Sequence, residues 1–196
     1  MPVQQLSNGV HQTHQALSEE RGYGVMPVLK KWPSFQKKQI VQASELHELA
    51  QNFDGIVHNL KEINAPNLRC GYRHLFTPEI HCKTPTKLSV KGFHHDPLGK
   101  IEQSGALTIQ KVIPENAHGC YKIRWGYRGE FKSSTMFPQH WTREQVMQSI
   151  QEAVNTGSFK KIKLGNKTFE GICKEGFNIE FHINDSGHVI SAYPLL

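Results

Sequence analysis

Two histidines and a lysine in this sequence, His74, His94 and Lys132, are the side-chain types that can cleave RNA without a metal ion. An imidazole both takes and gives a proton near neutral pH. One histidine can therefore deprotonate a ribose 2′-hydroxyl while the other protonates the leaving 5′-oxygen. A lysine ammonium can neutralise charge that builds on the phosphate oxygens. Because the chain has twelve histidines, residue types alone make this assignment weak.

Four short motifs around these residues are more specific. They follow one another as 74–80 (HLFTPEI), 92–94 (GFH), 131–138 (FKSSTMFP) and 187–194 (GHVISAYP). In this order they resemble the motifs of the EndoU endoribonucleases, bacterial toxin type, and the resemblance covers residues 72–196. The last motif is also similar to the C-terminal hairpin of the coronavirus uridylate-specific endoribonuclease. Residues 1–71 match nothing in the family.

The resemblance implies a role for each residue. His94 would be the general base on the 2′-hydroxyl, His74 the general acid, and Lys132 would complete the triad. The products would carry a 2′,3′-cyclic phosphate and a 5′-hydroxyl. Substrate contacts would come from Ser191, Tyr193 and Thr135. Ser191 does not fix uridine specificity, so the preferred RNA stays open.

One departure from the family pattern concerns the first two motifs. His74 and His94 are twenty residues apart (94 − 74), which is longer than the family spacing. We interpret residues 81–86 as a loop insertion, and His81 then competes with His74 for the acid role. His95 should lie outside the site, because successive strand residues face opposite ways.

Metal chemistry is an alternative that the sequence supports poorly. Ligand types do cluster at His81, Cys82, His94, His95 and Asp96. No HExxH, no CxxC and no carboxylate pair accompanies them. We therefore expect no catalytic metal and no cofactor, and no manganese stimulation, although some eukaryotic relatives depend on that ion. The four cysteines are predicted to be free thiols, and a Cys70–Cys82 disulfide stays open.

Composition bounds the class of protein. The chain has 196 residues, 37% hydrophobic content, a net charge of +6 and a pI near 9.1. This suits one domain or two subdomains, and a basic surface favours RNA or an acidic protein as partner. There is no apolar run of about 18 residues that could span a membrane. The first thirty residues lack the apolar region of a classical signal peptide.

Hydrophobic periodicity predicts an α+β fold with antiparallel sheets. Helices are expected at 44–63, with Ser44 as N-cap, and at 142–156, with a Thr142/Gln145 capping box. Residues 72–80 are predicted to be extended. Strands are expected at 88–93, 106–113, 120–127, 131–137, 167–173, 178–183 and 188–193. The resemblance adds an EndoU-like arrangement of two sheets flanked by helices with the cleft between them.

The predicted domain organisation has an N-terminal arm or linker at 1–43, with a short helix near 12–20, and a nuclease domain at 44–196. The nuclease domain divides into subdomains of about 44–127 and 128–196.

The resemblance further implies a delivered or secreted antibacterial toxin, of the kind used in contact-dependent inhibition, acting in the target-cell cytoplasm. Its RNA substrate would include tRNA as a candidate, and an acidic immunity protein would block its cleft. Two alternatives stay open. One is an EndoU-like module that binds RNA without cutting it, and the other is a metal-dependent phosphodiesterase.

Overall fold

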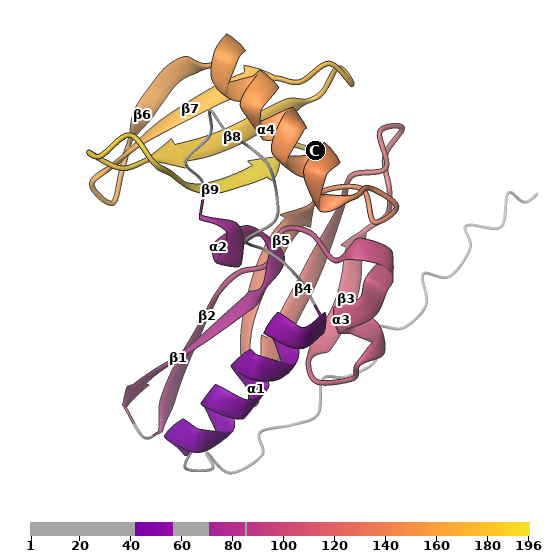
Figure 1. Ribbon diagram of the computed structural model, residues 1–196, viewed down its shortest axis with the longest axis vertical. Helices are drawn as coiled ribbons and strands as arrows, with labels where there is room; N and C mark the ends of the chain where they lie inside the picture. Colours follow the sequence, from indigo (N-terminus) through magenta and orange to yellow (C-terminus); the bar gives the residue numbers. More distant parts are fainter. Residues whose placement is uncertain (1–41, 57–70, 85) are drawn as a thin grey trace, which may run out of the picture. The chain divides into compact units, whose positions relative to one another are not determined.

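The computed structural model describes residues 42–56, 71–84 and 86–196 (Figure 1). All of them belong to a compact unit spanning residues 35–196. The predicted arm at 1–43, including its short helix, lies outside the described residues except for its last two positions. The helices are α1 (Ala43–Ile56), α2 (Tyr72–Phe76), the 3₁₀ turn η2 (Pro97–Gly99), α3 (Lys100–Gln103) and α4 (Arg143–Thr156).

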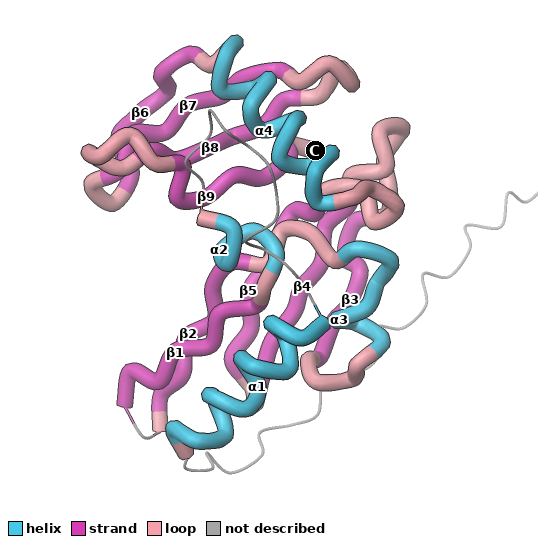
Figure 2. Tube along the Cα trace, viewed as in Figure 1, coloured by secondary structure: helices cyan, strands magenta, loops and turns pink. Residues whose placement is uncertain are grey.

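The strands form three antiparallel sheets (Figure 2). The first contains β1 (Pro78–Thr84) and β2 (Lys87–Gly92). The second has the order β3 (Thr108–Ile113), β4 (Tyr121–Tyr127) and β5 (Glu130–Met136). The third runs β6 (Ser158–Lys163), β7 (Asn166–Ile172), β8 (Asn178–Ile183) and β9 (Val189–Pro194). The α+β class is confirmed, with three hydrogen-bonded sheets where we expected two.

Helix α4 is the element whose sequence signals were clearest. Thr142 Oγ1 accepts from the Gln145 N–H at 3.2 Å, and the Gln145 side chain accepts from the Thr142 N–H at 2.7 Å. This is the predicted capping box. The helix packs on β7 and β8 at very close range, since a Cβ added to Gly171 would lie 1.8 Å from the Ala153 carbonyl oxygen. Only glycine fits at that position in β7.

Two predictions near the first histidine were wrong. Residues 72–76 form helix α2 rather than an extended segment. The consecutive buried pair Leu75 and Phe76 looks like part of a strand in the sequence. The helix ends there because Thr77 precedes a proline, which disfavours helical backbone, and Thr77 has φ −124° and ψ 141°. Residues 81–84, predicted as part of a loop insertion, instead lengthen the β1–β2 hairpin, in which Cys82 pairs with Leu88.

Two further differences concern element ends. Strand β6 was not predicted, because all six of its side chains are exposed and it has no buried alternation. Helix α1 begins at Ala43, close to the expected start, and its described part ends at Ile56. The rest of the predicted helix, 57–63, lies outside the described residues.

Candidate active site

The His94 backbone is fixed against helix α2 by a left-handed turn. Gly92 and Phe93 both have φ +66°, and the Phe93 N–H donates to the His74 carbonyl at 2.9 Å. The His94 N–H donates to the Leu75 carbonyl at 2.7 Å. A Cβ at Gly92 would lie 2.5 Å from the His74 carbonyl oxygen. The glycine of the GFH motif is therefore what lets the two histidine segments approach each other.

The His94 imidazole is buried, with 4% of its surface exposed. Its Nδ1 lies 3.0 Å from the Thr135 carbonyl oxygen, which can only accept, so Nδ1 carries the proton. Burial first, and then the nearby Lys132 ammonium, hold the pKa of His94 well below 6.5, although the Thr135 hydrogen bond opposes them. The ring is therefore neutral at physiological pH, with an unprotonated Nε2 that can accept a proton.

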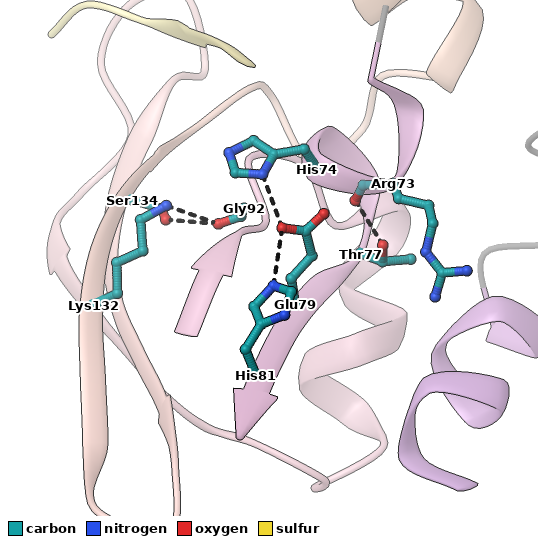
Figure 3. A network of polar contacts seen from close by, with 8 residues as sticks. All are labelled: Arg73, His74, Thr77, Glu79, His81, Gly92, Lys132 and Ser134. Carbon is teal, nitrogen blue, oxygen red and sulfur yellow. Dashed lines mark hydrogen bonds and ion pairs between the residues drawn. The ribbon is translucent and has the colours of Figure 1, made fainter. Parts of the chain in front are cut away.

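The His74 imidazole is oriented by a carboxylate that the sequence analysis did not single out. Its Nδ1 lies 3.1 Å from Glu79 Oε2, and this hydrogen bond is the main cause that lowers the pKa of Glu79. Figure 3 shows that carboxylate between the rings of His74 and His81. The ionised carboxylate accepts from Nδ1–H, which leaves the His74 Nε2 for other chemistry. The centroids of the His74 and His94 rings are 6.0 Å apart.

His81 does not take the place of His74 in this geometry. Its side chain is 53% exposed, and its Nε2 lies 3.7 Å from the same Glu79 oxygen. The described contacts of His81 are to Glu79, whereas His74 also has its ring beside His94. His95 points elsewhere too, because it is fully buried and packs edge-on against Phe76.

Lys132 enters the site from β5. Its Nζ donates to the Gly92 carbonyl at 3.1 Å, and Ser134, two residues on, donates to the same oxygen at 3.3 Å (Figure 3). Burial lowers the pKa of Lys132 to about 8, with the Glu79 charge acting in the opposite direction. The ammonium is therefore mostly protonated at neutral pH. It is bound to the turn that places His94.

The C-terminal sheet contributes an aromatic wall. The Tyr193 ring stacks on His94 with centroids 5.2 Å apart and an interplanar angle of 25°. Its hydroxyl donates to Glu180 and lies 3.2 Å from His182 Nε2. Burial and the Glu180 carboxylate raise the pKa of Tyr193, so the phenol stays protonated. Ser191 lies two residues earlier on the same face of β9 and is nearly buried.

The structure thus brings His74, His94, Lys132 and Tyr193 together, with Ser191 on the same wall. Thr135 contributes its backbone carbonyl, through His94, and this contact is not visible in the sequence. Three other residues of the network were missed, namely Glu79, Glu180 and His182. The sequence does place Glu180 and His182 on one face of a strand, but it does not reveal which strand lies beside it.

Metal-ligand geometry is absent from the part of the chain that the structure describes. No group of three or more His, Cys, Asp or Glu side chains is placed to hold an ion there. Cys82, Cys120 and Cys173 are free thiols, while Cys70 is not among the described residues. Of the helices described, none is long and apolar enough to cross a membrane.

Comparisons with known proteins agree with this site. The family model described as bacterial EndoU nuclease matches residues 71–196. A Bacillus cereus protein named Toxin is 36% identical over 158 residues, covering 77% of this chain and 27% of that protein. The chain thus spans about a quarter of the length of this relative. No solved structure matches significantly. Because the family match contains every residue of the site, the chain belongs to the bacterial EndoU nuclease family.

Proposed function

We propose that the protein is an endoribonuclease that cleaves RNA by metal-independent transesterification. Each product pair would carry a 2′,3′-cyclic phosphate and a 5′-hydroxyl. One observation carries the proposal: the two imidazoles lie 6.0 Å apart, and each has its Nδ1 bound to an acceptor, Glu79 or the Thr135 carbonyl. Each ring therefore has its Nε2 left for one of the two proton transfers that the reaction needs.

The electrostatics assign the two roles. His94 is kept neutral by burial and by Lys132, so it is the base that removes the 2′-hydroxyl proton. His74 is then the acid that protonates the leaving 5′-oxygen. The Glu79 carboxylate fixes its tautomer and stabilises the imidazolium form of the ring, as a buried aspartate does in serine proteases. The 2′-hydroxyl is part of the substrate, so attack is intramolecular and benefits from proximity.

Lys132 supplies positive charge beside this pair. With a pKa of about 8 it stays protonated at neutral pH, and its partly dehydrated ammonium interacts strongly with developing negative charge on the phosphate oxygens. The Tyr193 ring and Ser191 would contact the nucleotide 5′ to the cut, with Thr135 beside them. The Tyr193 hydroxyl is engaged by Glu180, which fixes the ring against His94.

The biological setting follows from the relative. That protein is named Toxin and is much longer than this chain. We infer a toxin domain that is delivered into a target cell and cuts RNA in its cytoplasm, with tRNA as the first candidate. A basic nuclease of net charge +6 would be inhibited by an acidic immunity protein that covers the cleft.

The test compares the wild type with His94→Ala on total tRNA in excess EDTA, followed by end-group analysis. We expect cyclic-phosphate ends from the wild type and none from the variant. His140→Ala, at an exposed histidine outside the site, is the matched control and should cleave normally. Thermal unfolding of each protein shows that the fold is intact.

Three outcomes would overturn the proposal. Cleavage by His94→Ala would remove the base. Cleavage that EDTA abolishes would favour a metal-dependent phosphodiesterase. Salt-sensitive RNA binding by a wild type that never cleaves would favour a binding module on the same scaffold.

A further inference from the structure

A continuous row of side chains crosses the four-stranded sheet from its edge to the site. The strand registers pair β6 with β7, β7 with β8, and β8 with β9 through Lys161, Thr168, His182 and Ser191. Directly paired residues of antiparallel strands project to the same face. The hydrogen bond of 2.9 Å between Thr168 Oγ1 and His182 Nδ1 shows this for the middle of the row. Lys161 therefore lies on the face that carries Ser191 and Tyr193.

Lys163 extends the same face by one step toward the tip of the β6–β7 hairpin. It pairs with Asn166, and as residue i+2 it projects to the same side as Lys161. Both lysines are exposed, and neither forms an ion pair with a carboxylate of the described residues. Their neighbour Lys160 does form one, with Glu170 at 2.9 Å. The two charges reach the site, because after burial they help to lower the pKa of His182.

We propose that Lys161 and Lys163 bind backbone phosphates of the RNA strand beyond the phosphodiester that is cut. The inference rests on the proposed function and extends it by giving the strand a path across the C-terminal sheet. Neighbouring strands are about 4.8 Å apart, so Lys161 lies about 14 Å from Ser191. That distance corresponds to roughly four nucleotides at about 3.4 Å of stacked strand each.

The chemistry of this face favours RNA over a protein partner. The face presents ammonium, amide and hydroxyl groups at Lys161, Lys163, Asn166 and Thr168. Such groups bind phosphate oxygens without reading base sequence. The exposed Ile162 of the same strand lies on the opposite face, where it pairs with Lys167. The lysine face thus lacks the apolar anchors on which protein interfaces depend.

Lys167 provides a matched control. It is exposed, carries the same charge and belongs to the same hairpin, but it projects from the opposite face. A general effect of net charge would be the same for all three lysines. A strand that follows the site face would distinguish Lys161 and Lys163 from Lys167.

The experiment measures binding of the full chain to a fluorescent 2′-O-methyl oligoribonucleotide, which lacks the nucleophile and cannot be cut. Affinity is determined between 50 and 200 mM salt for the wild type, Lys161→Ala, Lys163→Ala, the double variant and Lys167→Ala. Each lost phosphate contact on a single strand should reduce the salt slope by about 0.7, and the double variant should lose about 1.4. Its affinity deficit should therefore be about sevenfold larger at 50 mM than at 200 mM salt.

A double variant with the wild-type slope would overturn the inference, as would an equal loss in Lys167→Ala. A wild type that binds no oligonucleotide would overturn it too. Parallel cleavage of the unmodified oligoribonucleotide separates the two proposals. Absent cleavage with a lysine-specific salt slope refutes the ribonuclease but supports the phosphate path, and normal cleavage with unchanged slopes does the reverse.

Discussion

Replacing Lys132 by methionine should abolish catalysis and make the protein more stable. The side chain is largely buried, and burial lowers its pKa from 10.5 to about 8. The folded protein therefore holds the charged lysine less favourably than the unfolded chain does. Methionine has a similar length and no charge, so it should fill the same space without that penalty.

The magnitude follows from the pKa. A fall from 10.5 to about 8 corresponds to about 3 kcal/mol of lost stability at neutral pH, as an upper limit. Lys132 retains some contact with water, and the variant loses the 3.1 Å hydrogen bond to the Gly92 carbonyl. Ser134 still donates to that carbonyl, so the oxygen keeps a partner. We expect a net gain of about 1–2 kcal/mol in the free energy of unfolding at pH 7.

The pH dependence gives the sign an independent check. The folded-state pKa of Lys132 is lower than the unfolded value, so between pH 8 and 10.5 the unfolded chain holds a proton that the folded protein has released. Wild-type stability should rise in that window relative to the variant, by at most about 1.4 kcal/mol per pH unit. The advantage of Lys132→Met is therefore complete below pH 8 and disappears as the pH approaches 10.5.

Denaturant unfolding at pH 7, 8, 9 and 10 measures this difference, and an RNA cleavage assay at pH 7 should show a fall in kcat of about 10²–10³-fold. Lys167→Met, at an exposed lysine, is the control and should be close to neutral in both assays. Parallel stability curves for wild type and Lys132→Met would refute the claim that Lys132 is held under a burial penalty. Retained cleavage would refute its catalytic role.

The two remaining predictions concern the histidines. Glu79→Gln should lower kcat by about 10–100-fold with little change in KM, because the amide no longer dictates which His74 nitrogen carries the proton; an unchanged kcat would remove Glu79 from the mechanism. For His94, burial and Lys132 disfavour the imidazolium, so the base stays neutral well below pH 6.5. The acidic limb of kcat/KM against pH should lie below 6.5, and a limb at or above that value would contradict the assignment.

Local signals in the sequence were sufficient for much of the fold. The Thr142/Gln145 capping box appears in α4 as expected, because capping depends only on residues three apart. The strands at 120–127 and 178–183 were predicted from alternation, which works where one face is buried, as in Ile123 and Trp125. Strand β6 has no buried face and therefore had no such signal.

The site required information that is not local. The motifs named His74, His94 and Lys132, and the structure places them around one turn at Gly92. The partners of these side chains come from other elements and from the backbone, as with the Thr135 carbonyl, 41 residues from His94. Strand register brings His182 beside Tyr193, and a single sequence does not specify register between distant strands.

The arrangement of charges itself identifies the class of substrate. Lys132, His74 and His182 all act on His94 in the same direction, disfavouring its positive form. The carboxylates beside them are already engaged, Glu79 by His74 and Glu180 by Tyr193. Crowded cationic groups of this kind repel one another until an anion lies among them. A phosphodiester placed between the two imidazoles and Lys132 would relieve that repulsion, and its charge in the transition state would relieve it further, which is how binding becomes catalysis.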